Sequence, residues 1–297
     1  MEHAVSVMVI FLCRLIAHIP LNVMYRMSDA MYPFMRYILQ YRRKVVRTNL
    51  RNSFPEMEQR ELNKIEKEFY RHLCDCIMET IKLLHISDKE MERRVIIHNT
   101  YLIEEIASEG HPIVVFLGHY GNWEWVQEIT RRYSLPKVSG EIYRPISSRV
   151  FSRLMKCIRS RYSTVLIPQK SAVRTIIKMK QEYDTFLIGF ISDQRPIRRS
   201  LNHWTRFLNQ ESPYMVGGEE IGKHIGASFL YLDIEKPRRG QYIMTVKKMS
   251  PPQSDEEYPY TLLYLQMLEA TIRRAPQYWL WTHKRWKHKR KKTITTD

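Results

Sequence analysis

The sequence predicts an α/β fold, a mixed sheet flanked by helices, preceded by a helical N-terminal region. Residues 1–95 carry helical periodicity, whereas from residue 111 short β-rich runs alternate with helical stretches. Such alternation is typical of a layered α/β domain. The run Ile-Val-Val-Phe-Leu at 113–117 is continuously apolar, which a strand covered on both faces requires. We therefore expect a helical region at 1–95 and an α/β domain at 96–297.

Individual elements follow from apolar periodicity and from helix breakers. In the N-terminal region, helices are expected at 23–39, 43–52 and 57–84, with Pro55 at the boundary between the last two. In the second part, strands are expected at 113–117, 164–167, 186–191, 228–234 and 242–247. Helices are expected between them at 123–132, 147–161, 172–181, 213–224 and 260–275.

The first residues form an apolar run near 4–19, interrupted by Arg14 and ended by Pro20. A helix of about sixteen residues is roughly 24 Å long, short of the roughly 30 Å hydrocarbon core of a bilayer. No positive segment or cleavage site of a secretory signal accompanies it. We expect a membrane-anchoring helix that lies in the interface or crosses with Arg14 snorkelling. An ordinary core helix is the alternative interpretation.

The net charge of +17 indicates an anionic partner, such as acidic lipid, an acidic carrier protein or nucleic acid. Seven lysines and arginines lie between 284 and 292, beside Trp279, Trp281 and Trp286. Tryptophan beside basic residues suits an interface with anionic headgroups. A solvated tail and a nucleic-acid patch are the alternatives. The four cysteines lack metal-ligand spacing and favour a reducing compartment.

A candidate catalytic residue, His119, follows the strand expected at 113–117. It would therefore lie at the carboxyl end of that strand, where open α/β sheets bind ligands. Gly118 and Gly121 permit tight backbone geometry and close approach of a substrate. Asn122 is expected to cap the helix that begins near residue 123, and the N–H groups at that helix start are expected to hold an oxyanion.

A histidine in this setting can take a proton from a hydroxyl nucleophile, and Glu124 is expected to bind its other ring nitrogen. Because no Gly-x-Ser-x-Gly elbow is present, the nucleophile would be the hydroxyl of the acceptor. With 11 histidines and 31 acidic residues, about one such spacing is expected by chance. We interpret the second match, His85 and Glu90, as a chance pair. A turn histidine satisfied by local hydrogen bonds is the alternative for His119.

The segment Gly-His-Tyr-Gly-Asn-Trp-Glu at 118–124 resembles the signature of the late lipid A acyltransferases, the lauroyl and myristoyl transferases of lipopolysaccharide biosynthesis. Further motifs follow in the order of that family, so the resemblance covers nearly the whole chain. They are Asn-Leu-Arg-Asn-Ser-Phe-Pro-Glu (49–56), Tyr-Arg-Pro (143–145), Arg-Ser-Arg-Tyr (159–162), Ser-Asp-Gln (192–194), Phe-Leu-Asn (207–209) and Tyr-Trp-Leu-Trp-Thr-His-Lys-Arg-Trp-Lys (278–287).

The resemblance implies an enzyme that moves a fatty acyl chain from acyl carrier protein or acyl-CoA to a hydroxyl of a lipid A precursor. In such enzymes the histidine is the general base and the acidic residue its partner, here His119 and Glu124, and no acyl-enzyme forms. The fold implied is glycerophosphate-acyltransferase-like, at the cytoplasmic face of the inner membrane. We expect an anionic membrane surface and a membrane glycolipid acceptor as partners, and neither a metal, another cofactor nor nucleic acid.

Three other positions in matching motifs invite binding roles. Arg144 is expected to hold a substrate phosphate or carbonyl through its planar donor fork, and Arg161, with Arg159 as the alternative, to serve similarly. Asp193 follows the strand expected at 186–191 and would orient Arg144 or the acceptor. A helix-surface charge is the alternative for the arginines, and a structural cap for Asp193.

The chain departs from the family pattern at two places. Ser163 stands where a glycine commonly follows the Arg-x-Arg-Tyr element, and the segment 195–209 is strongly basic. These differences leave open the acyl chain length, the acceptor hydroxyl and the acceptor lipid. Another glycolipid, a phospholipid or an aminolipid is therefore an alternative acceptor. A non-catalytic basic protein that binds membranes or nucleic acid is a further alternative.

Overall fold

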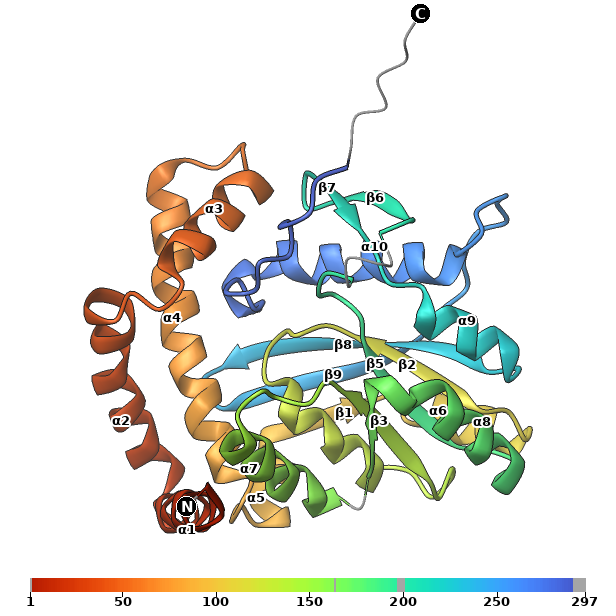
Figure 1. The fold of residues 1–297 in the computed structure, drawn as a ribbon, viewed down its shortest axis with the longest axis horizontal. Helices are drawn as coiled ribbons and strands as arrows, with labels where there is room; N and C mark the ends of the chain where they lie inside the picture. The colour runs from red at the N-terminus through yellow and green to blue at the C-terminus, as the bar shows by residue number, and fades with distance from the viewer. Residues whose placement is uncertain (1, 163, 197–200, 291–297) are drawn as a thin grey trace, which may run out of the picture.

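The computed structural model describes residues 2–162, 164–196 and 201–290, so that Ser163, Lys291 and Lys292 lie outside the described residues. A seven-stranded sheet flanked by helices forms the body of the molecule, as the sequence predicts (Figure 1). The N-terminal helices stand along one side of this body, and the first strand of the sheet begins at Val95.

The sheet is mixed, with the strand order β1-β9-β8-β2-β5-β3-β4. Only β8 and β9 pair antiparallel; the other neighbours are parallel. The strands are β1 (Val95–His98), β2 (Ile113–Leu117), β3 (Ser139–Tyr143), β4 (Val165–Pro168), β5 (Leu187–Ile191), β8 (Ser228–Arg238) and β9 (Gln241–Lys248).

All five predicted strands are confirmed. Two strands of the sheet, β1 and β3, were not predicted, and the residues of each explain why. Strand β1 has four residues and is partly exposed, so its apolar pattern is short. Strand β3 contains Gly140 and Glu141, neither of which is typical of a strand. A separate hairpin, β6 (Trp204–Phe207) and β7 (Gln210–Pro213), was also missed. Its two turn residues, Leu208 and Asn209, both have positive φ.

Helices cover the sheet, and their packing against its strands fixes the positions of the strand ends. Helix α10 packs against β8 and β2, α6 against β2 and β9, and α8 against β4. The predicted helix at 213–224 begins only at Gly217, because Pro213 ends strand β7 and residues 214–216 form the connection to the helix. The helices of this part are α5 (Asp88–Arg94), α6 (Tyr101–Ser108), α7 (Arg149–Arg159), α8 (Ala172–Glu182), α9 (Gly217–His224) and α10 (Pro259–Arg274), joined by short 3₁₀ turns η2 (Trp123–Arg131), η3 (Ser160–Tyr162), η4 (Gln169–Ser171) and η6 (Pro276–Tyr278).

Strand β2 is the centre of the core, because all five of its residues are buried. Phe116 stacks on Phe229 of β8 and on Tyr264 of α10, with ring centroids 6.1 and 5.0 Å apart. The Tyr264 hydroxyl also donates to the Leu117 carbonyl, at 2.8 Å. Burying each of these side chains contributes roughly 1.5–3 kcal/mol, so the carboxyl end of β2 is firmly placed.

The N-terminal region contains α1 (Glu2–His18), α2 (Leu21–Pro33), the π-helical turn η1 (Phe34–Ile38), α3 (Arg43–Ser53) and α4 (Gln59–Lys82). The single helix expected at 23–39 is divided at Pro33, which has no N–H for the helical hydrogen bond. In the part of the chain that the structure describes, no single helix is long and apolar enough to span a membrane. Helix α1 and the segment Leu21–Ile38 meet that criterion only as a pair, bent by 118°.

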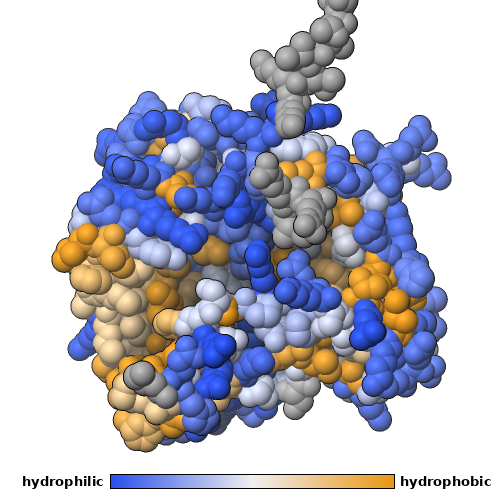
Figure 2. Space-filling model, in the orientation of Figure 1, coloured by the Kyte–Doolittle hydropathy of each residue, from blue (hydrophilic) through white to orange (hydrophobic). Residues whose placement is uncertain are grey.

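Apolar side chains are exposed along this N-terminal segment, and Figure 2 shows them as an area over α1, α2 and η1. We call this area the apolar face. Its members are Val5, Val7, Met8, Phe11, Leu12, Leu15, Val23, Met27, Phe34, Tyr37, Ile38 and Leu39. An exposed area of this kind marks a contact with a protein, a membrane or a ligand rather than ordinary surface.

A buried carboxylate joins the N-terminal helices to α4. The side chain of Glu66 is 1% exposed and accepts from the Nε atoms of Arg36, Arg43 and Arg47, at 3.3, 2.7 and 2.9 Å. Burial alone would raise the pKa of Glu66, but these arginines hold it below its ordinary value. Helix α4 is thereby fixed to η1 and α3.

Candidate active site

His119 and Asp193 meet because their strands are neighbours in register. In the parallel pair β2–β5, Leu117 lies opposite Ile191. Each functional residue follows two positions later, so both side chains leave the sheet at the same carboxyl edge. This is the edge at which open α/β sheets bind ligands.

The carboxylate of Asp193 is 1% exposed and holds His119 at two points. Its Oδ1 lies 2.6 Å from His119 Nδ1, and its Oδ2 accepts from the His119 backbone N–H at 2.9 Å. Trp279 Nε1 also donates to Oδ2, at 2.8 Å. Burial alone would raise the pKa of Asp193, but the charge and hydrogen bonds of His119 and the Trp279 hydrogen bond keep it below its ordinary value.

These contacts decide which ring nitrogen can act as a base. An ionised carboxylate only accepts hydrogen bonds, so Nδ1 of His119 carries the proton and Nε2 keeps its lone pair. Gln194 Nε2 lies 3.3 Å from His119 Nε2 and can only donate, so its amide N–H hydrogen-bonds to this lone pair. The His119 side chain is 19% exposed, so Nε2 is reachable from a cavity while Nδ1 is held.

The structure corrects the predicted contact between His119 and Glu124, and with it the expected role of Asp193. Glu124 instead accepts two hydrogen bonds from Arg159, at 2.9 and 2.7 Å, and one from Trp123 Nε1 at 3.1 Å. The reason is local: the chain enters the 3₁₀ turn η2 at Trp123, which directs Glu124 toward the end of α7. Asp193 takes the orienting place, rather than binding Arg144 or acting as a cap.

Glu124 belongs to a second polar cluster in the same cavity. Arg159 bridges Glu124 and Glu141, whose Oε1 is 3.3 Å from Arg159 Nε. Gln127 Nε2 donates to the other Glu141 oxygen at 2.8 Å. Burial raises the pKa of Glu141 to about 7, against the opposing charge of Arg159. This carboxyl is therefore partly protonated at neutral pH.

The cavity beside His119 has a volume of about 830 Å³ and changes character along its length. His119, Glu124, Arg144 and Arg159 are among its polar lining residues. Its apolar lining, from η2, β3, β4 and α8, includes Val126, Ile129, Ile142, Leu166, Val173 and Ile176. A cavity with an apolar part and a few convergent polar groups is typical of a small-molecule or lipid site.

Of the two candidate arginines, Arg159 lines this cavity and Arg161 does not. Arg161 donates to Asp88 at 2.5 Å and lies over the ring of Tyr162. Helix α7 ends at Arg159, and the following 3₁₀ turn takes Arg161 to another side. Arg144, by contrast, is exposed at the cavity wall.

Gly121 and Asn122 hold the loop behind His119 and do not line the cavity, contrary to the binding roles expected for them. Gly121 has φ +59°, and an added Cβ would lie 2.9 Å from Ile234 Cγ2, so only glycine fits. Asn122 accepts from the Glu124 N–H at 3.2 Å, which confirms the predicted cap. That N–H is therefore already bonded and not directed at an oxyanion.

The tryptophans near the tail are structural, which corrects their interpretation as membrane-interface residues. Trp279 is 3% exposed and Trp281 is fully buried, and Trp281 Nε1 donates to the Pro276 carbonyl at 2.6 Å. Arg285 is fully buried as well, and burial lowers its pKa to about 10 while the charge of Asp193 opposes this. The 276–286 segment thus forms the buried support of the site, where Trp279 donates to Asp193.

Sequence reasoning missed Glu141, Gln194 and Trp279 as site residues. Gln194 and Trp279 lie in motifs of the resemblance, but nothing in their spacing indicates what they contact. Glu141 lies in the strand that was not predicted. Within residues 2–162, 164–196 and 201–290, no three His, Cys, Asp or Glu side chains are placed to hold a metal ion.

A histidine at a cavity wall whose Nδ1 is bonded to a buried carboxylate has the geometry that general-base chemistry requires. The chain belongs to the bacterial lipid A biosynthesis acyltransferases, whose family model matches residues 1–288. It is 22% identical over 276 residues to the lipid A biosynthesis lauroyltransferase of Escherichia coli (strain K12), covering 92% of this chain and 88% of that protein. The family resemblance of the motifs is confirmed, and the protein is an acyltransferase.

The raised pKa of Glu141 predicts a pH-dependent change in stability. The folded protein holds this proton up to about pH 7, whereas an unfolded glutamate releases it near pH 4.5. The stability that this group contributes is therefore lost as pH rises between these values. In Glu141→Gln that loss is absent, so the free energy of unfolding of the variant relative to wild type should rise by at most about 3 kcal/mol between pH 5 and 8.

Urea denaturation at several pH values measures this difference. Glu182→Gln, which alters an exposed carboxylate at the end of α8, is the matched control and should give a constant difference from wild type. A constant difference for Glu141→Gln as well would contradict the assignment.

Proposed function

We propose that the protein transfers a fatty acyl chain from an acyl thioester, on acyl carrier protein or CoA, to a hydroxyl of a lipid A precursor. The observation that carries the proposal is His119 at the cavity wall: Asp193 binds its Nδ1, so that Nε2, which accepts from Gln194, is the nitrogen left to take a proton. Family membership supports acyl transfer in lipid A biosynthesis. The thioester donor and the acceptor hydroxyl belong to the proposal.

In the proposed reaction, His119 Nε2 takes the proton of the acceptor hydroxyl as its oxygen attacks the thioester carbonyl. The C–O bond forms and the carbonyl electrons move to oxygen, giving a tetrahedral intermediate. Its collapse breaks the C–S bond, and the imidazolium returns the proton to the leaving thiolate. Asp193 stabilises the imidazolium between these two transfers. The acyl group passes directly from sulfur to oxygen, without an acyl-enzyme.

A second cavity supports a reaction between two substrates. It has a volume of about 380 Å³, and three of its lining residues, Arg42, Trp123 and Gln194, also line the larger cavity. The two cavities therefore share a wall, in which Gln194 and Trp123 contact His119. We assign the acyl chain to the apolar part of the larger cavity, and the acceptor to the smaller one, where Arg42 suits a phosphorylated lipid.

We further propose that the protein works at the cytoplasmic face of the inner membrane. The exposed side chains of the apolar face support this, since a lipid acceptor is reached from a bilayer. The described tail residues Lys284, Lys287, Lys289 and Arg290 add positive charge, which favours an anionic surface.

Replacing the base and its partner tests the chemistry. His119→Ala should abolish acyl transfer, because no other group in the proposal takes the proton. Asp193→Asn should lower kcat by about 10³–10⁴-fold, because an amide no longer fixes the tautomer or stabilises the imidazolium. Both are measured with a radiolabelled acyl thioester and a lipid A precursor.

Glu182→Gln serves as the activity control as well and should leave the rate unchanged. Normal transfer by purified, folded His119→Ala would overturn the proposed mechanism, and it would favour a non-catalytic role for the 118–124 motif.

The acceptor is tested by the product. Cells that lack this protein should make lipid A that is short of one acyl chain, a mass difference that mass spectrometry resolves. Complementation with wild type should restore the chain and His119→Ala should not. An unchanged lipid A spectrum, together with an altered phospholipid or aminolipid profile, would favour the alternative acceptors.

The membrane proposal is tested with a matched pair of exposed aromatic residues. Phe11 in the apolar face is 59% exposed, and Tyr101 at the start of α6 is 61% exposed. Phe11→Asp should reduce flotation with vesicles that contain anionic lipid, whereas Tyr101→Asp should not. Equal flotation of the two variants would refute the role of the apolar face.

A further inference from the structure

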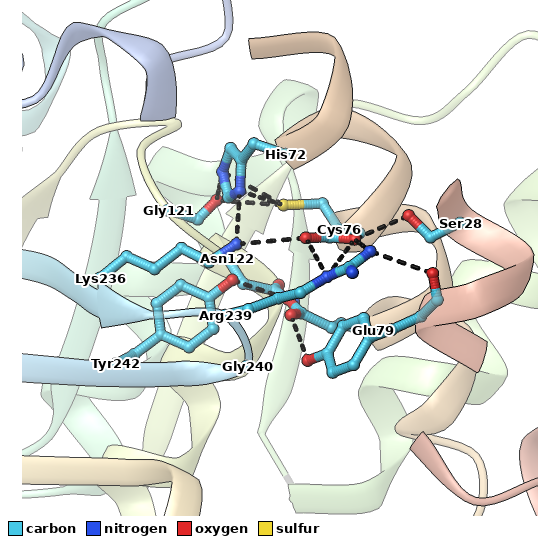
Figure 3. Close-up of polar contacts among 12 residues, drawn as sticks. Ser28, His72, Cys76, Glu79, Gly121, Asn122, Lys236, Arg239, Gly240 and Tyr242 are labelled. Atoms are coloured by element: carbon cyan, nitrogen blue, oxygen red, sulfur yellow. Dashed lines mark hydrogen bonds and ion pairs between the residues drawn. The ribbon is translucent and has the colours of Figure 1, made fainter. Parts of the chain in front are cut away.

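Helix α4 has a buried polar face where a core helix would ordinarily be apolar. His72, Asp75, Cys76 and Glu79 follow the spacing i, i+3, i+4, i+7, and each is at most 6% exposed. Burying such groups is costly unless every one is hydrogen-bonded. Figure 3 shows His72, Cys76 and Glu79 directed at the loop containing Gly121 and at the β8–β9 hairpin.

Glu79 is the junction of this face. Its Oε2 accepts from Asn122 Nδ2 at 2.8 Å and from the Tyr242 hydroxyl at 2.7 Å. Its Oε1 accepts from the Tyr25 hydroxyl of α2 at 2.7 Å, and its backbone carbonyl accepts from Trp125 Nε1 at 3.1 Å. One residue thus binds the loop on both sides of Trp123, and also binds α2.

His72 makes a second connection to the same loop. Burial lowers its pKa well below the ordinary value, and the charge of Lys236 lowers it further, so the ring is neutral. Lys236 Nζ lies 3.0 Å from Nδ1 and can only donate, which leaves the proton on Nε2. Nε2 then donates to the Gly121 carbonyl at 3.2 Å. Lys236 Nζ also forms an ion pair with Asp75, whose Oδ2 is 3.7 Å away.

The opposite side of the loop is held by the C-terminal segment. Leu280 N–H donates to the His119 carbonyl at 3.1 Å, and Gly121 N–H donates to the Tyr278 carbonyl at 2.9 Å. The backbone around His119 is therefore held by hydrogen bonds both from that segment and from α4. Among the residues that the structure describes, no hydrogen bond or ion pair joins the α4 polar face to the His119 ring, so its influence on the ring passes through the loop.

We propose that Glu79 and His72 are positioning residues that set the backbone of residues 118–122 and thereby the alignment of His119 Nε2 with its substrate. This inference rests on the proposed role of His119. A misplacement of a catalytic group by about 1 Å lowers the rate by about 10²-fold. The polar face is therefore required for turnover as well as for packing.

The test compares leucine and glutamine at both positions. Leucine removes every polar contact, whereas glutamine keeps an acceptor for Asn122 at position 79, and an acceptor and a donor at position 72. Glu79→Leu and His72→Leu should lower kcat per folded molecule by about 10- to 100-fold with KM changed less than about twofold. Glu79→Gln and His72→Gln should recover most of kcat.

Glu66→Leu is the matched control for a purely structural role. Glu66 lies on the same helix and is equally buried, but its partners are the arginines of η1 and α3. It should lower the midpoint of urea unfolding while leaving kcat per folded molecule near that of wild type. Equal kcat values in Glu66→Leu, His72→Leu and Glu79→Leu, each corrected for the folded fraction, would overturn the proposal.

Two further variants keep the outcome decisive. If Glu79→Leu does not fold, Tyr242→Phe removes one hydrogen bond to Glu79 and should still lower kcat without changing KM. An unchanged kcat in folded His72→Leu and Tyr242→Phe would refute the positioning role. His119→Ala is assayed alongside: activity in that variant would sink the proposed function, whereas an inactive His119→Ala with normal His72→Leu would sink only this inference.

Discussion

The carboxylate of Asp193 is the interaction on which the site depends. It is buried, and it accepts hydrogen bonds from the side-chain and backbone N–H groups of His119 and from the indole N–H of Trp279. It therefore joins the ends of β2 and β5 to the C-terminal segment. An ionised carboxylate at this depth is stable only while these donors are present, so the geometry of His119 and the folding of three distant segments are linked.

The fold was largely predictable, because its strongest signals are local. The apolar run of β2 and the alternation after it give the class of fold, and Pro33 and Pro55 lie at or beside helix ends. Strands without an apolar pattern cannot be predicted in this way. Strand β3, with Gly140 and Glu141, is an example, because tertiary packing rather than intrinsic propensity makes it a strand. The division of the first long helix at Pro33 follows from a rule already known for proline.

The site was predictable in part, and the limit lies in strand pairing. His119 and Asp193 were each expected at a carboxyl strand end, but no local pattern shows that β2 and β5 are neighbours. Glu124 was preferred because it is near in sequence, and nearness in sequence is a poor guide where a chain enters a 3₁₀ turn. The contact of His72 with Lys236 joins residues 164 positions apart, so no local sequence pattern indicates it.

Trp279 makes the Asp193 carboxylate depend on a segment 86 residues further along the chain. It is the third donor to Asp193, and it lies in the segment that also holds the His119 carbonyl through Leu280. A proteolytic cut between α10 and this segment would therefore remove one donor from Asp193 and one from the His119 backbone, although it would leave every strand of the sheet intact. Damage to the C-terminal segment thus changes the hydrogen bonding at the carboxyl edge of β2 and β5.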